Sequence, residues 1–337
     1  MRNGSVNKKA LITIVVILVL LVLCVAWFFR HRPPVAGAAV TPNPVVAVRP
    51  TRIAAPVVIS APLPAADVPL TQVFDELNRR AGQGDPAAAC RLAIELERCD
   101  EIQQSLASYD EQLWRLQRAE ENNEVDVADH QGRAAWKKML DSMALGLVKQ
   151  AERCEGIRPV SAKQRVALWR QSALAGNPGA VTHYVVGNAF RNREMLELLP
   201  ELQHYRQEAE TMALKAASRG DLQVSLALAA AYSPRRDTGK RVFLAQVVKP
   251  DVARSLTLYR RGSRQLPATA APRARNVIDD NIAWLLQHAT ASDLSRAEAL
   301  DQQWGREWAS APIDGSSQLT VSAEGGVADI APSRCAD

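Results

Sequence analysis

The clearest pattern along the chain is an unbroken apolar run near its N-terminus, from Ala10 to Phe29. As a helix, its 20 residues would rise about 30 Å, which matches the hydrocarbon core of a bilayer. We therefore expect a single transmembrane helix over residues 10–29, preceded by a cytoplasmic N-terminus over residues 1–9. A cleaved signal peptide is the alternative, because Ala36-Gly37-Ala38 resembles a cleavage site, although such a signal has a shorter apolar region.

The next segment, residues 30–69, is rich in proline, alanine and valine and lacks helical periodicity. Nine of the 19 prolines lie between residues 33 and 69. Proline is disfavoured in helix interiors and in sheet ladders. We expect a disordered or polyproline II linker that holds the following domain away from the membrane.

From residue 70 to residue 310 the pattern is one of successive helices, rich in Ala, Leu, Glu, Gln and Arg. Three segments share the spacing Ala-x-x-Gly followed by Asp or Asn. Glycine suits the left-handed position just past a helix end, and Asp or Asn caps the start of the next helix. The spacing therefore predicts three helix–turn–helix hairpins, with turns at Gly84-Asp85, Gly176-Asn177 and Gly220-Asp221.

The same segments resemble a repeat family. Residues 169–180, WRQSALAGNPGA, are similar to the core of a Sel1-like repeat, a relative of the tetratricopeptide repeat. Residues 249–260, KPDVARSLTLYR, resemble the start of another. The resemblance covers residues 160–262, with a weaker echo at 74–95. It implies an α-solenoid that serves protein–protein contact, with no catalytic residues to carry over.

The expected fold class is therefore all-α. A transmembrane helix and a disordered linker precede an α-solenoid of stacked helical hairpins over residues 70–310. Residues 311–337, rich in Ser, Gly and Ala, are expected to form a disordered tail.

The cysteines constrain this picture. Cys90 and Cys99 lie on one predicted helix, about 13.5 Å apart, which is too far for a disulfide. Cys99 precedes a helix predicted from residue 100, and Cys154 follows a helix that ends near residue 152. An antiparallel hairpin of these helices would favour a Cys99–Cys154 bridge. Cys90 is then expected to be a buried free thiol, and Cys335 either cross-links chains or has no role.

Charge is distributed unevenly along the chain. The five basic residues that flank the apolar run account for the excess of 41 Lys and Arg over 36 Asp and Glu, so the remaining chain is neutral. A nucleic-acid-binding domain would carry a basic excess, so we expect no nucleic-acid partner. The numbers of basic residues on the two flanks of the apolar run are nearly equal. They therefore give only a weak indication of how the transmembrane helix is oriented in the membrane. We expect the C-terminal domain in a bacterial periplasm; the alternative is a cytoplasmic domain.

Candidate chemistry is sparse. The five histidines are scattered, and Cys-x-x-Cys, phosphate-loop, dinucleotide and Gly-x-Ser-x-Gly motifs are absent. We therefore expect no metal, no cofactor and no catalytic residues. Trp304 and Trp308 lie one helical turn apart and could form a ledge for a ligand or cap the last helices. Arg235 and Arg236 lie in a basic loop that could contact an acidic partner or lipid headgroups; the alternative is an ordinary solvated loop. Three further tryptophans are expected to fill hairpin cores: Trp114, Trp136 and Trp169.

Two functions fit the sequence. The first is a scaffold or adaptor at the bacterial inner membrane, attached through residues 10–29, that binds an envelope protein or peptide. The second is an envelope enzyme, an all-helical hydrolase or lyase with an acid in a helical cleft. A shallow groove would favour the first, and a deep pocket with a buried carboxylate would favour the second.

Overall fold

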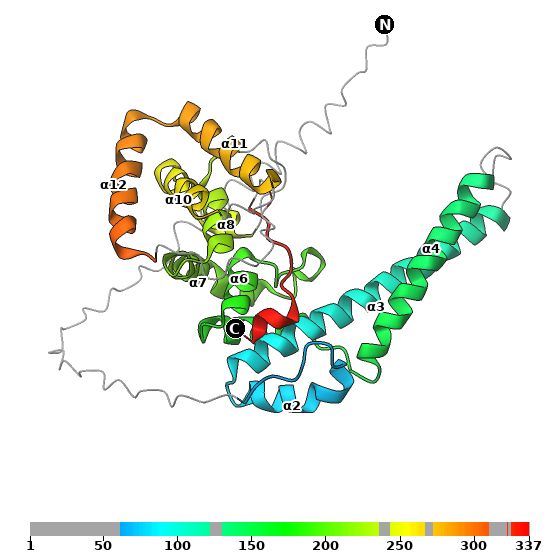
Figure 1. Cartoon of the computed structure of the whole chain (residues 1–337). Helices are drawn as coiled ribbons and strands as arrows, with labels where there is room; N and C mark the ends of the chain where they lie inside the picture. Colours follow the sequence, from blue (N-terminus) through cyan, green and yellow to red (C-terminus); the bar gives the residue numbers. More distant parts are fainter. Residues whose placement is uncertain are drawn as a thin grey trace, which may run out of the picture. The chain divides into compact units, whose positions relative to one another are not determined.

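The computed structural model describes residues 61–121, 130–235, 243–266, 272–309, 322 and 325–336, which belong to one compact unit, Val57–Asp337. Most of these residues are helical, and none of them lies in a β-strand (Figure 1). The helices are α2 (Leu70–Gly82), α3 (Pro86–Glu121), α4 (His130–Ala151), α5 (Ala162–Leu174), α6 (Pro178–Val186), α7 (Leu199–Ser218), α8 (Leu222–Tyr232), α9 (Leu244–Val247), α10 (Val252–Gln265), α11 (Pro272–His288) and α12 (Ala291–Glu307).

The expected fold class needs a correction. Among the described residues, no helix has both the length and the apolar character that crossing a bilayer requires. The helix α8 is almost entirely buried but has only 11 residues, and the 36-residue α3 carries charges along its length. The described fold is thus all-helical without a transmembrane helix. Residues 10–29 lie outside the described part of the chain, as do residues 1–9 and most of the linker.

Three short turns connect successive helices in the same way. Gly84, Gly176 and Gly220 have φ values of 90°, 91° and 94°. At the third turn the N–H of Asp221 donates to the carbonyl of Ala216, and that of Gly220 donates to Ala217. This is the Schellman pattern, which requires a left-handed residue and therefore favours glycine. The turns lie where the sequence predicts them.

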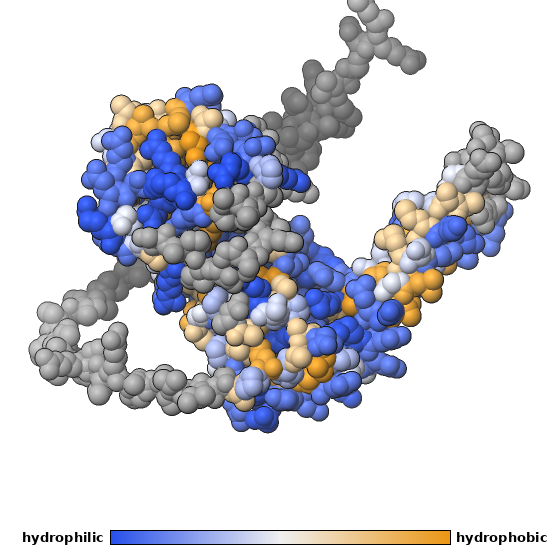
Figure 2. Space-filling view, viewed as in Figure 1, coloured by the Kyte–Doolittle hydropathy of each residue, from blue (hydrophilic) through white to orange (hydrophobic). Residues whose placement is uncertain are grey.

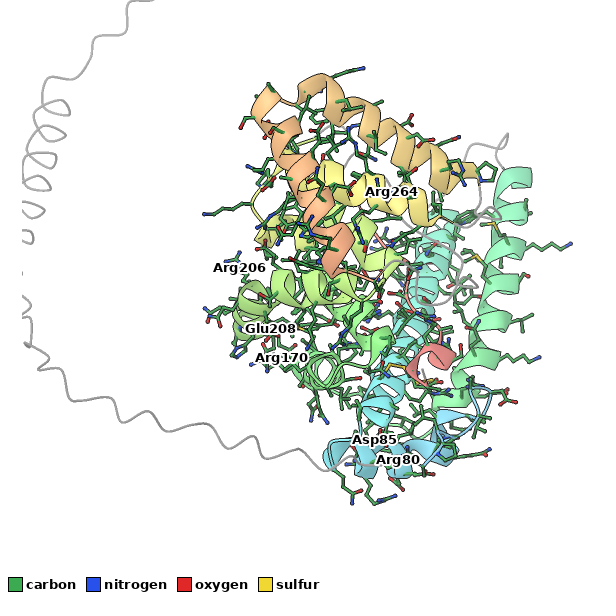
Figure 3. The ribbon with its side chains drawn as sticks, turned by 60° about the vertical axis from the view of Figure 1, so that its left-hand side comes forward. Arg80, Asp85, Arg170, Arg206, Glu208 and Arg264 are labelled. Atoms are coloured by element: carbon green, nitrogen blue, oxygen red, sulfur yellow. A yellow bond between two sulfur atoms is a disulfide. The ribbon has the colours of Figure 1, made fainter. Side chains whose placement is uncertain are left out.

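Each turn residue after the glycine caps the next helix. A side-chain oxygen of Asp85, Asn177 or Asp221 accepts a hydrogen bond from a backbone N–H in the first turn of α3, α6 or α8, at 2.9–3.2 Å. Pro86 and Pro178 follow two of these caps, where a missing N–H costs nothing. The first turn is also held by Arg80, whose Nη2 lies 2.7 Å from an Asp85 carboxylate oxygen (Figure 3).

The helices pack in chain order. Close neighbours are α2 with α3, α3 with α5, α5 with α6, α6 with α7, α7 with α8, and α8 with α10. Ten of the eleven residues of α8 are buried, so this helix lies inside the fold. Its small side chains allow close approach, and Gly262 of α10 leaves room for Leu226, because an added Cβ would come within 2.6 Å of it. The last helices, α11 and α12, pack against α10.

The C-terminal segment, residues 325–336, corrects the expectation of a disordered tail. It packs against α3 and α6, and Cys335, fully buried, forms a disulfide with Cys90 of α3. Asn177 Nδ2 donates to the Cys335 carbonyl at 2.9 Å. Cys90 is therefore not a free thiol, because a partner 245 residues away reaches it. The rest of residues 311–337, apart from Ser322, lies outside the described part.

A second disulfide joins Cys99 and Cys154, with Cα atoms 5.7 Å apart. This is the bridge that the sequence favours, and it lies at the base of the antiparallel pair formed by α3 and α4. The described chain is thus a helical protein with two disulfides.

The last nine residues of the expected linker, 61–69, are also ordered. Arg80 donates to the carbonyls of Ala61 and Pro62, and Arg153 donates to those of Asp67 and Val68. This proline-rich segment is not helical, so its backbone carbonyls have no partners within a helix. Arginine side chains supply the hydrogen bonds instead.

Candidate functional site

An extended concave surface runs along α3, where it meets α4 and the loop that follows α6. It consists of two adjoining cavities of about 630 and 610 Å³, and Glu101, Arg191 and Arg193 line both. We call this surface the α3 groove. Its two parts differ in chemistry because different elements form their walls.

The first cavity has one apolar wall and one polar wall. Leu140, Met143 and Leu147 of α4 form the apolar wall, and their spacing of three and four residues places them on one helix face. Apart from Glu101, the facing residues of α3 are uncharged and polar: Gln104, Ser105, Ser108, Tyr109 and Gln112. Such a combination suits an amphipathic segment better than a fully polar one.

The two helices that form this cavity make an arm, which we define as residues 103–121 of α3 together with α4. Figure 1 shows that the arm extends beyond the other helices. Trp114 and Trp136 are 55% and 44% exposed, so they do not fill a hairpin core as expected. Met143 is 56% exposed. Each helix of the arm covers only one face of the other, so the outer faces of both stay exposed. Figure 2 shows apolar side chains along the arm.

The second cavity has the C-terminal segment as one wall. Val327, Ala328 and Asp329 line it, opposite Phe243 and the loop after α6. Asn188 Nδ2 joins the two sides, because it donates to the Val327 carbonyl at 2.8 Å and to the Asp329 carboxylate at 3.2 Å. The Cys90–Cys335 disulfide therefore holds part of the groove in place.

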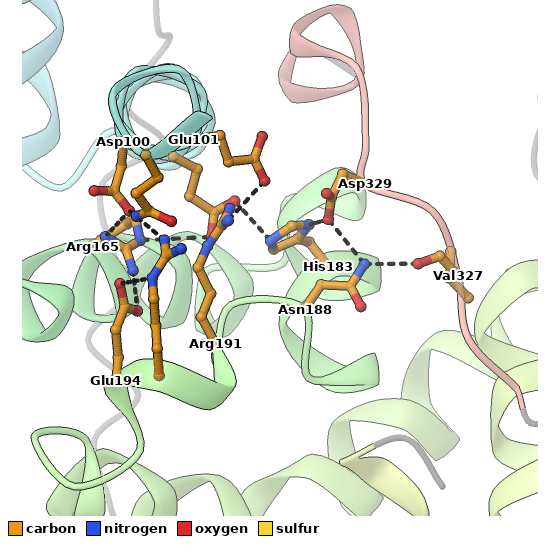
Figure 4. Close-up of polar contacts among 12 residues, drawn as sticks. Asp100, Glu101, Arg165, His183, Asn188, Arg191, Glu194, Val327 and Asp329 are labelled. Carbon is orange, nitrogen blue, oxygen red and sulfur yellow. Dashed lines mark hydrogen bonds and ion pairs between the residues drawn. The ribbon is translucent and has the colours of Figure 1, made fainter. Parts of the chain in front are cut away.

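A buried ionic cluster lies beneath the groove (Figure 4). Glu97 and Arg165 are 3% and 1% exposed, with Nε of Arg165 3.7 Å from Oε1 of Glu97. Arg165 also pairs with Glu194 and lies 3.6 Å from Asp100. Arg191 Nη1 contacts Glu101 at 2.7 Å. Each buried charge thus has an opposite charge nearby. Such pairing is needed because removing a charged side chain from water is costly.

His183 lies at one end of this cluster. Its Nε2 is 3.0 Å from a Glu97 carboxylate oxygen, and its Nδ1 is 3.7 Å from Asp329. The ring stacks on Trp169 with centroids 4.0 Å apart, and its side chain has no exposed surface. A histidine between two carboxylates resembles the base of a catalytic group. This ring, however, is enclosed, and neither His183 nor Glu97 lines the two cavities of the groove.

Two buried carboxylates of α3 near the groove are paired with basic side chains. Glu95 and Glu97 are buried carboxylates, but both pair with arginines, Glu95 with Arg91 at 2.8 Å. Arg193 lies 3.1 Å from Asp100, but its side chain is 47% exposed and can also contact a ligand. Across the residues that the structure describes, no group of three His, Cys, Asp or Glu side chains could hold a metal ion.

The aromatic and basic residues suggested by the sequence lie elsewhere. Trp304 is buried and stacks on Trp308 with ring centroids 4.2 Å apart, and Arg261 lies over Trp308. The pair thus belongs to the packing of α12 on α10 instead of forming an open ledge. Arg235 lies 5.9 Å from the ring centroid of Trp284. Arg236 lies outside the described residues.

Sequence reasoning missed the α3 groove and its ionic cluster. The charged residues come from α3, α5, α6, the loop after α6 and the C-terminal segment. One local signal was present, because Glu95 and Glu97 interrupt the apolar stretch AAACRLAIELERC at residues 87–99. Charges at such positions indicate buried partners, but they do not identify them.

Comparison of this chain with protein-family models, with curated proteins and with solved structures found no match.

Proposed function

We propose that this protein is a protein–protein interaction module whose α3 groove binds an amphipathic, acidic helix of another protein. The observation that carries the proposal is the groove itself, which has an apolar wall on α4, a polar wall on α3 and arginines at one end. A third helix laid along the arm would bury the apolar stripe in the way that helices bind grooves in many complexes.

The partner's charge follows from the residues around the groove. The described part of α4 carries Lys137, Lys138 and Lys149, while its one acid, Asp141, accepts a hydrogen bond from the Tyr109 hydroxyl at 2.9 Å. A second copy paired symmetrically through α4 would bring these lysines together, which is unfavourable. An acidic helix from a different protein avoids this repulsion.

The proposed location is the bacterial periplasm, at the inner membrane. The two disulfides support an oxidising compartment, because such bonds are rare in the cytosol. Attachment through residues 10–29 is part of the proposal, and those residues lie outside the described chain. We further propose that the hairpins are degenerate Sel1-like repeats, supported by the three identical turns.

Site-specific photo-cross-linking tests the binding function. A benzophenone amino acid replaces Met143 in the full chain, in the cells that make it, and the adduct is identified by mass spectrometry. Leu286 of α11, which is 43% exposed, provides the control position. We expect one adduct of defined mass from Met143, mapped to a partner helix with apolar residues at intervals of three and four, and none from Leu286.

The charge requirement is tested with Arg193→Glu, which should strongly reduce the Met143 adduct. Because Arg193 is half exposed, its loss should change stability by less than about 1 kcal/mol, and a thermal melt checks this. The proposal is wrong if the adduct has the mass of two copies of this chain. It is also wrong if Met143 and Leu286 give the same adducts, or if Met143 gives none.

A further inference from the structure

A third cavity lies away from the α3 groove, between the end of α5, the start of α6 and the last two turns of α7. It encloses about 230 Å³, and most of its lining is apolar. The floor consists of small and flexible side chains: Ala173, Gly176, Pro178, Val181, Met212 and Ala216. The small residues around the turn at Gly176 therefore do more than let two helices pack closely. They also leave this cavity open.

Two cations line this cavity, Lys215 in the last turn of α7 and Arg219 directly after the end of that helix. They are four residues apart, and like charges at this spacing destabilise a helix. Neither side chain forms an ion pair or hydrogen bond with any part of the chain that the structure describes. Arginines on neighbouring helices, by contrast, are neutralised by acids, because Arg170 pairs with Glu208 and Arg254 pairs with Glu210. The two unneutralised cations thus mark this cavity as a place for an anion.

One acid, Asp221, also lines the cavity, but its oxygens have other partners. Oδ1 accepts a hydrogen bond from the Val224 N–H at 2.9 Å, and Oδ2 accepts one from the Thr182 hydroxyl at 2.9 Å. Asp221 therefore serves as the cap of α8 and leaves Lys215 and Arg219 free to bind an external anion.

We propose that this cavity binds a small amphipathic anion, such as a medium-chain carboxylic acid. Its apolar body would contact Ala173, Met212 and Ala216, and its carboxylate would lie between Lys215 and Arg219. The volume has room for about eight heavy atoms at the roughly 30 Å³ that each water occupies in the liquid. This suits the hydrocarbon chain of such an acid, with its carboxylate at the exposed edge beside Lys215 and Arg219. It is smaller than the roughly 300–1,000 Å³ of pockets for drug-sized ligands. This inference is independent of the proposed function, because none of these residues lines the α3 groove.

Equilibrium dialysis of labelled octanoate against the full chain tests the proposal. We expect saturable binding of one octanoate per chain with a dissociation constant of about 100 µM or lower. Lys215→Gln and Arg219→Gln should each weaken binding about tenfold. Both side chains are exposed, so both variants should fold. The matched control is Arg206→Gln, because Arg206 is exposed on the same helix but does not line the cavity (Figure 3).

Three further probes separate the contributions of the head group and the apolar body. Octanol and octylamine should bind at least tenfold more weakly than octanoate, and acetate should not saturate the site. Ala216→Leu, which fills the floor, should abolish octanoate binding while circular dichroism shows a folded chain. Equal binding of octanol, no effect of the Lys215 and Arg219 variants, or binding only of a peptide that ends in a free leucine carboxylate would overturn the proposal.

Discussion

At the scale of single residues, Glu208 connects three helices. Its carboxylate accepts hydrogen bonds from Arg170 of α5 at 2.7 and 2.8 Å and from the Tyr184 hydroxyl of α6 at 2.7 Å (Figure 3). Burial raises the pKa of Glu208, but these hydrogen bonds outweigh burial and hold the pKa below its ordinary value. The charged form of Glu208 is therefore the form that stabilises the fold.

This depressed pKa gives a pH-dependent prediction. Because the folded state holds the Glu208 pKa below the unfolded value near 4.5, its stabilisation is present above that pH and is lost as pH falls through the folded pKa. Glu208→Gln should lower the free energy of unfolding by about 1–2 kcal/mol at pH 7. The difference from the unmodified chain should shrink below about pH 4. Urea denaturation at pH 7, 5 and 3.5 measures it.

The exposed Glu197 provides the control, since it lies on the loop before α7 and forms no hydrogen bond or ion pair within the described residues. Glu197→Gln should change stability by less than about 0.5 kcal/mol at all three pH values. A Glu208→Gln deficit that stays constant down to pH 3.5 would show that the charge of Glu208 is not what stabilises the contact.

At the scale of elements, the turn between α2 and α3 shows how backbone conformation alone decides the effect of a substitution. Gly82 ends α2, and Gly84 follows with φ of 90°. A Cβ at either position would meet no atom within 4 Å. The two glycines thus differ in conformation and not in the space around them.

We predict opposite effects for the same change at these two positions. Gly82→Ala should raise the free energy of unfolding by about 0.5 kcal/mol, since alanine favours the helix. Gly84→Ala should lower it by about 1 kcal/mol, because a side chain is strained at positive φ. Thermal and urea melts of the two variants compare them directly. Two changes of the same sign would contradict the left-handed turn at Gly84.

The elements also show what the sequence can predict. The turns at Gly84, Gly176 and Gly220 follow from signals within a few residues, namely a small residue, a glycine and a capping side chain. The exposure of Trp114 and Trp136 could not be predicted in this way. Helical periodicity identifies a helix face, but it does not tell whether another helix covers that face.

At the scale of the whole molecule, the contacts that form the α3 groove come from distant parts of the chain. Arg191 contacts Glu97 and Glu101, and Asn188 bonds to Val327 and Asp329 about 140 residues later. Composition alone suggested that the C-terminal segment is disordered. Its order depends on the Cys90–Cys335 bridge and on Asn177 and Asn188, and no local pattern marks these long-range partners.

The Cys90–Cys335 disulfide should therefore control both stability and the shape of the groove. The double variant Cys90→Ala/Cys335→Ala lacks this bridge, which joins residues 245 positions apart in the sequence. Its free energy of unfolding should be lower by about 3–4 kcal/mol. Hydrogen exchange should rise in residues 325–336, which cover His183 and line the second cavity. The matched variant, Cys99→Ala/Cys154→Ala, should increase exchange at the base of the arm and leave residues 325–336 protected. Equal protection of residues 325–336 in both variants would show that hydrogen bonds alone hold this segment in place.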